Sequence, residues 1–198
     1  GANKTLHDFT VKDIDGNDTI NSLDKTIIGS PLPDFSYGFS INAGYKNFDF
    51  NCQLMGLSGN DLVNGMNFYL YGENATNKSR GLIDRWIPDN QNTDVSKIGN
   101  GTHNMKFSTF FIEDGSFLKI KNITFGYSLP NKLLGKVKIE KLRIYTTIQN
   151  LYTFTKYSGM EPEVGKSVNW SASPLDIGVD GATYPHPRTF LFGLNLSF

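Results

Sequence analysis

The sequence lacks the long hydrophobic runs that a membrane-spanning helix requires. Its longest uninterrupted apolar run covers only Phe68 to Tyr71, whereas a spanning helix takes about 18 such residues or more. Strands that span a membrane alternate lipid-facing and lumen-facing residues, so they keep mean hydropathy low; here it is −0.32. These observations exclude a membrane-spanning helix, but they are compatible with a membrane-spanning β-barrel. No charged and then apolar signal segment follows Gly1, so we expect the chain to begin within a longer protein.

Net charge, cysteine and catalytic motifs are also scarce. The 19 Lys and Arg residues balance 19 Asp and Glu residues, so no long-range field attracts nucleic acid. The single Cys52 cannot form an internal disulfide, and its alternating surroundings predict a small apolar residue. The three histidines are dispersed, and neither a Ser-His-Asp spacing nor a glycine-rich phosphate loop is present. We therefore predict that the chain is not an enzyme and binds no nucleic acid.

Aromatic residues and glycine are abundant, which favours many short strands and turns over packed helices. Aromatics reach 13% and glycine numbers 20. Residues 189–198 divide between two faces, one of which is wholly apolar: Phe190, Phe192, Leu194, Leu196 and Phe198. This predicts a strand, in either a sandwich edge or a barrel.

Four further segments repeat the alternation. Residues 35–45 and 48–54 predict a hairpin with its reversal at Lys46-Asn47, and residues 142–149 predict another strand. Residues 117–129 also alternate, but the apolar parity changes at Asn122, which predicts a β-bulge or the point where the strand leaves a membrane.

The connections between these strands alternate between short and long. They cover two residues at 46–47, roughly 60 at 57–116, about 11 at 130–140 and about 33 at 155–187. Outer-membrane barrels have short periplasmic turns and long extracellular loops. Five strands cannot close a barrel, since bacterial barrels have at least eight. We therefore predict an all-β, antiparallel transmembrane β-barrel, completed by residues outside this sequence.

Four blocks, in this order, resemble the C-terminal region of the SusC/RagA-type TonB-dependent transporters. They are residues 28–35 (IGSPLPDF), 111–124 (FIEDGSFLKIKNIT), 149–159 (QNLYTFTKYSG) and 184–198 (YPHPRTF and the final strand). The blocks are spread over most of the chain, from residue 28 to residue 198, and although each one alone is weak, the set is highly specific.

The resemblance implies a plugged barrel of about 22 strands in the bacterial outer membrane. It implies import of oligosaccharides or peptides, driven by TonB, with a SusD-like surface lipoprotein over the extracellular mouth. The plug and the TonB-contacting segment lie N-terminal in such proteins, outside this sequence. Residues 1–33 are then an extracellular loop with an acidic turn, and residues 34–198 are the C-terminal strands and loops.

The final strand also resembles the signal that the barrel assembly machinery recognises. Gly193, Leu196 and Phe198 hold the positions that carry it. The same face can simply contact membrane lipid, and both roles are compatible.

An acidic segment near the start is similar to a calcium-binding EF-hand loop. Oxygen ligands would come from positions 1, 3, 5, 7 and 12, which are Asp13, Asp15, Asn17, Thr19 and Asp24. Two departures oppose it: Asp18 replaces the glycine at position 6, and Asp24 is shorter than the usual glutamate. The alternatives are a structural Ca²⁺ and an ordinary acidic turn.

The long connections carry aromatic side chains that could contact substrate or a partner lid: Tyr69, Tyr71, Trp86, Tyr157 and Trp170. Packing of one loop on another is the alternative for each, and Trp86 lies in a recurrent family motif, which favours an architectural role. A different class of function, a secreted β-sandwich that binds carbohydrate through its loops, would share the alternating strands. Solubility without detergent would distinguish it from a barrel.

Overall fold

The computed structural model describes residues 9–71, 78–97, 107–135, 139–164 and 177–198. The chain divides into two compact units. One, the strand unit, consists of Leu32–Asn60, Asp114–Glu163 and Tyr184–Phe198. The other, the connection unit, consists of Gly1–Pro31, Asp61–Glu113 and Val164–Thr183. The chain leaves the strand unit at residues 61–113 and 164–183, so the long connections predicted from the sequence belong to a unit of their own.

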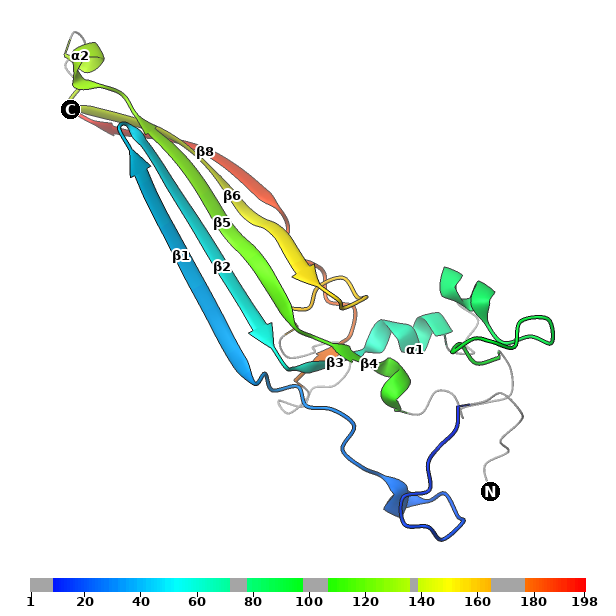
Figure 1. Ribbon diagram of the computed structural model, residues 1–198. Helices are drawn as coiled ribbons and strands as arrows, with labels where there is room; N and C mark the ends of the chain where they lie inside the picture. Colours follow the sequence, from blue (N-terminus) through cyan, green and yellow to red (C-terminus); the bar gives the residue numbers. More distant parts are fainter. Residues whose placement is uncertain (1–8, 72–77, 98–106, 136–138, 165–176) are drawn as a thin grey trace. The chain divides into compact units, whose positions relative to one another are not determined.

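The strand unit is a single antiparallel sheet of five long strands (Figure 1). In sheet order these are β1 (Phe35–Tyr45), β2 (Phe48–Ser58), β5 (Phe117–Ser128), β6 (Lys141–Thr155) and β8 (Thr189–Ser197). Each strand pairs with the next one along the chain within this sheet, and the five predicted strands are confirmed. The sheet is open at β1 and β8, as expected of a segment of a larger barrel.

Short connections leave the sheet at one end and long ones at the other. Lys46 and Asn47 make the predicted reversal between β1 and β2, with Lys46 in the left-handed region at φ 54°. At the same end the short helix α2 (Asn131–Leu134) joins β5 to β6, and β8 finishes there (Figure 1). The alternation of short and long connections therefore follows from the antiparallel order.

The register places most of the apolar residues of the five strands on one face. Residues directly opposite one another in an antiparallel pair share a face. One row across the sheet reads Ile41, Cys52, Ile123, Ile148 and Phe190. The parallel row on the other face reads Asn42, Asn51, Thr124, Thr147 and Leu191. We call these the apolar face and the polar face.

The parity change at Asn122 is a β-bulge at Lys121. The register of β5 against β2 shifts there, because Asn122 pairs with Gln53 while Ile120 pairs with the next residue, Leu54. The pairing of β5 with β6 shifts at the same place, next to Asn150 with its positive φ of 51°. One extra residue reverses the alternation, so Lys119 lies on the same face as Asn122.

The connection unit contains short elements that the sequence did not predict. The strands β3 (Asp61–Asn64), β4 (Ile112–Asp114) and β7 (Val179–Asp180) form a small sheet in the order β4-β3-β7, in which β3 and β7 are parallel. Helix α1 (Gly65–Tyr71) follows β3, and 3₁₀ turns occupy Ser22–Asp24, Arg80–Asp84 and Thr109–Phe111. Among the described residues no helix is both long and apolar enough to cross a membrane.

Aromatic packing gives the connection unit its core. Phe68 of α1 stacks on Phe111, with ring centroids 3.9 Å apart and planes within 16°. Phe111 and Leu62 are almost fully buried. Burial of two aromatic rings and a leucine contributes several kcal/mol by area, about 25 cal/mol for each Å². These contacts join residues more than forty positions apart, so the long connection is a folded segment.

Candidate functional site

The polar face of the strand unit carries a bidentate ion pair between β2 and β6. Arg143 donates from Nε to Asp49 Oδ1 at 2.8 Å and from a terminal nitrogen to Oδ2 at 2.5 Å. The pair spans the intervening strand β5 above Gly126, where an added Cβ would collide with both charged groups. Glycine at this position therefore leaves room for a charge pair that links three strands.

Glycines on this face also make room for a tyrosine ring. The side chain of Tyr145 lies over Gly193 of the neighbouring strand β8, and an added Cβ on Gly193 would meet that ring. On the apolar face, Tyr37 covers Gly56 in the same way, and its hydroxyl donates to the carbonyl of Phe117 at 3.1 Å. Such rings shield the backbone at a glycine and fix the register of the two strands.

Other polar groups on the polar face pair across the strands. Asn51 Nδ2 donates to Asn42 Oδ1 at 2.6 Å, and the hydroxyls of Thr124 and Thr147 lie 2.8 Å apart. This face therefore presents amides, hydroxyls and a charge pair, which suit contact with water or with another polar protein surface.

The apolar face has the opposite character, because large hydrophobic side chains on it are exposed in this chain. About half or more of the surface is exposed for Phe39, Ile41, Tyr45, Phe48, Phe125, Ile144, Phe190, Phe192 and Leu194. A soluble monomer rarely exposes a continuous apolar patch of such extent. A second apolar phase or a partner must cover it.

The strand lengths match a bilayer. β1 and β2 have 11 residues each. At about 3.3 Å per residue and a tilt of about 40°, such a strand rises roughly 28 Å, close to the ~25 Å apolar band of outer-membrane barrels. Lipid is therefore the covering phase that fits both the extent and the chemistry of the apolar face.

The acidic segment folds as a tight turn held by its own carboxylates. Asp13 accepts hydrogen bonds from the backbone N–H groups of Gly16 and Asp18, both at 2.7 Å. Asp24 accepts from the N–H groups of Asn21, at 2.7 Å, and Ile14, at 2.8 Å, which hold the pKa of its carboxyl below the usual range.

The five predicted calcium ligands therefore lie in one turn, and carboxylate oxygens of three of them, Asp13, Asp15 and Asp24, lie within 4.8 Å of one another. Asn17 Oδ1 accepts instead from the N–H of Thr19 at 2.8 Å. Asp18 adopts φ 61°, the left-handed conformation for which the EF-hand loop uses glycine. Because backbone N–H groups already bind these carboxylates, the fold of the turn is accounted for without an ion, and calcium binding stays a prediction.

The aromatic candidates differ in how much surface they offer. Tyr69 and Tyr71 lie on α1, where Tyr69 is exposed and Tyr71 packs edge-on to Phe110 with centroids 5.5 Å apart. Trp86 follows a 3₁₀ turn, and its backbone N–H donates to the carbonyl of Val95 at 2.9 Å. Tyr157 belongs to the strand unit and is buried. Trp170 lies outside the described residues.

The three residues of the predicted assembly signal lie in or just after β8. Gly193 is on the polar face under Tyr145, whereas Leu196 is on the apolar face opposite Leu142. Phe198 follows the strand and is largely exposed. The sequence reasoning missed a packing role for Gly193, and it also missed a cluster of charges around Lys119. The parity change at Asn122 was the available signal for that cluster.

The comparisons with known proteins agree with this geometry. No family model matches the chain. It is 39% identical, over 94% of its length, to TonB-dependent receptor P3 of Formosa agariphila, and 35% identical, over 94%, to TonB-dependent receptor SusC of Bacteroides thetaiotaomicron. Among solved structures it is similar to the RagAB peptide transporter, with a TM-score of 0.76 and 30% identity over 91% of this chain.

The chain spans about a fifth of the length of each of these proteins: 18% of the first receptor, 17% of SusC and 19% of the matched transporter chain. Its five antiparallel strands, open at both edges and apolar on one face, are a fragment of their barrel. The chain therefore belongs to the SusC/RagA-type TonB-dependent receptors, as a segment of such a protein.

Proposed function

We propose that this chain supplies strands and connections to a transporter that actively imports nutrients across the bacterial outer membrane. The observation that carries the proposal is the two-faced sheet: an exposed apolar face of spanning length backs a polar face with paired amides, hydroxyls and charges. Lipid on one side and a polar interior on the other are the environments that such a sheet requires.

The proposed substrates are oligosaccharides or peptides. Among the relatives, one solved structure is named a peptide transporter, and other relatives are named TonB-dependent receptors. The proposed partners follow from the same likeness: the remaining barrel and its plug, TonB as the source of energy, and a SusD-like lipoprotein on the extracellular side. Among the candidate aromatics that the structure describes, Tyr69 is the one with an exposed side chain, and we propose it for a contact with substrate or lid.

We propose further that the end of β8 is read by the barrel assembly machinery. Phe198 is largely exposed and Leu196 is on the apolar face, so both side chains are available to a partner that approaches the open edge. Gly193 also serves packing under Tyr145, so its substitution would test two roles at once.

Deletion and complementation test the transport proposal. The gene for the full-length transporter is deleted, and uptake of labelled oligosaccharides and of labelled peptides is measured with and without TonB. We expect uptake of one of these classes to be lost on deletion and restored by the intact gene only when TonB is present. Uptake of both classes that persists in the deletion strain would contradict the proposal, and uptake restored without TonB would indicate a passive pore.

A further inference from the structure

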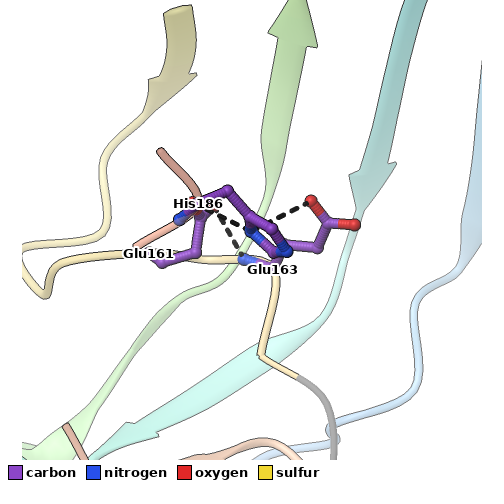
Figure 2. Close-up of side chains that lie close together, drawn as sticks. All are labelled: Glu161, Glu163 and His186. Atoms are coloured by element: carbon purple, nitrogen blue, oxygen red, sulfur yellow. Dashed lines mark hydrogen bonds and ion pairs between the residues drawn. The ribbon is translucent and has the colours of Figure 1, made fainter. Parts of the chain in front are cut away.

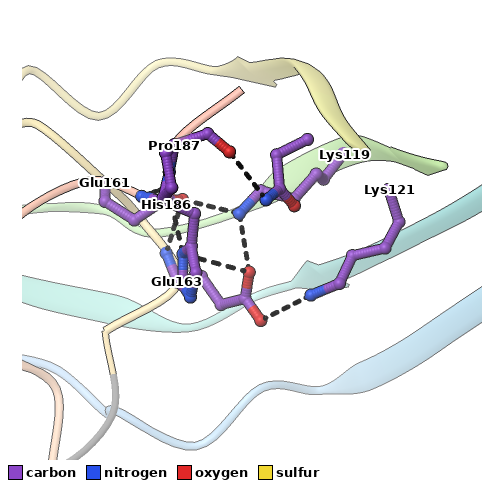
Figure 3. Close-up of polar contacts among 7 residues, drawn as sticks. Lys119, Lys121, Glu161, Glu163, His186 and Pro187 are labelled. Atoms are coloured by element: carbon purple, nitrogen blue, oxygen red, sulfur yellow. Dashed lines mark hydrogen bonds and ion pairs between the residues drawn. The ribbon is translucent and has the colours of Figure 1, made fainter. Parts of the chain in front are cut away.

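A buried lysine on the polar face of β5 binds two carboxylates from the segment that follows β6. The Lys119 side chain is 1% exposed, and its Nζ lies 3.0 Å from Glu161 Oε1 and 2.6 Å from Glu163 Oε2. Figure 3 shows the ammonium between the two carboxylates, with Lys121 approaching Glu163 from the side. Lys121 Nζ lies 3.5 Å from Glu163 Oε1. A lysine is almost never buried to this extent unless its charge is paired.

The bulge places Lys119 in this cluster. Without the extra residue at Lys121, Lys119 would share the apolar face with Ile123 and Phe125. The bulge turns it to the polar face, where the chain after β6 folds over it. The β-bulge therefore re-aims one charged side chain, which is a recurrent use of bulges.

A third segment, just before β8, joins the same cluster. The backbone N–H of His186 donates to Glu161 Oε2 at 3.4 Å, and its ring Nδ1 lies 3.5 Å from the same oxygen. The carbonyl of the next residue, Pro187, accepts from Asn150 Nδ2 at 3.1 Å. The cluster thus connects β5, the segment that leaves β6 and the segment that enters β8.

The carboxylate and imidazole atoms of this cluster are also possible metal ligands, but the bound ammonium of Lys119 is evidence against a metal ion. Ligand atoms of Glu161, Glu163 and His186 lie within 4.8 Å of one another. Figure 2 shows the three side chains close together. Two carboxylates and an imidazole form a common divalent-metal ligand set. Here the Lys119 ammonium already binds both carboxylates, and with Lys121 it balances their two negative charges. The lysine supplies the positive charge that a metal would otherwise bring.

We propose that Lys119 is a positioning residue: an internal counter-ion that holds the end of the β6 segment and the start of the β8 segment on β5. Residues 164–183 of the connection unit leave the strand unit after Glu163 and return to it at Tyr184. Lys119 therefore fixes both points at which this connection is attached. The role concerns contacts within this chain and does not depend on the proposed transport.

The electrostatics of Glu163 agree with this role. Burial raises the pKa of its carboxyl, but the ammonium groups of Lys119 and Lys121 and the neighbouring His186 lower it by more, so the pKa lies below its ordinary value. A carboxyl with a lowered pKa contributes stability above its unfolded pKa and loses it as the pH falls through the folded pKa. The pairing of Glu163 is therefore complete at neutral pH and is lost only in acid. Glu161 faces the same ammonium, and His186 Nδ1 faces both carboxylates.

Hydrogen–deuterium exchange on the full-length transporter in detergent tests the proposal. Loss of one partner from a buried ion pair strongly destabilises the other. In Lys119→Met we expect amides of residues 157–163 and 184–188 to exchange about 100-fold faster. Exchange in the β1–β2 hairpin should stay unchanged, which shows that the sheet is intact.

The matched control is Lys121→Met, on the same strand two residues away. Its side chain is 41% exposed and meets Glu163 only at 3.5 Å, so exchange should change little. Lys119→Arg should restore much of the protection. The double variant Lys119→Met with Glu161→Gln should exchange little faster than whichever single variant exchanges faster, because both substitutions remove the same interaction.

The proposal would be overturned if these amides exchanged at the wild-type rate in Lys119→Met. It would also be overturned if Lys119→Met and Lys121→Met accelerated their exchange equally. If Lys119→Met accelerates exchange throughout the barrel, the whole fold is destabilised, and the single variant Glu161→Gln then tests the positioning role. Acceleration confined to residues 157–163 and 184–188 would support the positioning role, and unchanged exchange there would overturn it.

Discussion

Replacing Ile41 by arginine places a charge in the middle of the apolar face. Ile41 lies near the centre of β1, opposite Cys52, and is 50% exposed in the chain by itself. The neighbouring Ser40 lies opposite Gln53 on the polar face, so Ser40→Arg is a matched control one position away. The two variants add the same charge to the same strand and differ only in the face that receives it.

The expected magnitudes differ because the two faces meet different phases. Arginine at the midplane of a lipid-facing strand costs about 2–4 kcal/mol, a factor of roughly 30 to 1,000 in the folding equilibrium. On a face in contact with water, a surface substitution changes stability by about 0.5 kcal/mol or less. Ile41→Arg should therefore destabilise the barrel strongly, and Ser40→Arg only slightly.

The assay is folding of the full-length protein into lipid vesicles across a urea series. Folded protein is measured by its faster migration on an unboiled denaturing gel. We expect the midpoint of Ile41→Arg to fall well below that of Ser40→Arg, which should stay near the wild type. Equal midpoints for the two variants, or a lower one for Ser40→Arg, would refute the assignment of the faces.

Four further outcomes follow from other features of the structure. Gly193→Val should lower thermal stability because its side chain meets the Tyr145 ring, and Tyr145→Ala should relieve part of that loss; additive melting temperatures would contradict the packing. Deleting Phe198 should reduce folded protein in isolated outer membranes, and an unchanged yield would remove its assembly role. Calorimetry on the intact transporter should detect calcium binding, and Asp13→Asn should weaken it. If no heat of binding is detected, the segment is an ordinary acidic turn. Backbone N–H groups lower the pKa of the Asp24 carboxyl, so carbon-detected NMR should find this group ionised to a lower pH than an ordinary aspartate. Its stabilising contribution should be lost only as the pH falls through that lowered pKa. Titration at an ordinary aspartate pKa would contradict these hydrogen bonds.

The long strands could be predicted from the sequence because their signal is local. In the hairpin of β1 and β2, alternation and a two-residue reversal lie within 24 residues, and the register pairs Tyr45 with Phe48 as that reversal requires. The bulge could also be located, because it reverses the parity of apolar residues at Asn122. In each case the information lies within one or two neighbouring segments.

The connection unit could not be predicted, because its elements are short and depend on distant partners. β7 has two residues and pairs with β3 more than a hundred positions earlier, so no periodicity marks it. The cluster at Lys119 is similar: the sequence places a charge on an alternating strand, but its partners Glu161 and Glu163 are brought there by folding. The parity change at Asn122 indicates which face Lys119 takes, but no pattern in a single sequence indicates which carboxylates will meet it.

We infer that the apolar face of the five-stranded sheet lies in lipid. Single cysteines at positions 190, 191, 192, 194 and 195 of β8, in a cysteine-free full-length protein, test this assignment. Each cysteine carries a fluorophore and is exposed to lipids with a quencher on the acyl chain. We predict strong quenching at positions 190, 192 and 194 and weak quenching at 191 and 195, which lie on the polar face. Uniform quenching, or none at any position, would contradict the assignment of this face to the membrane.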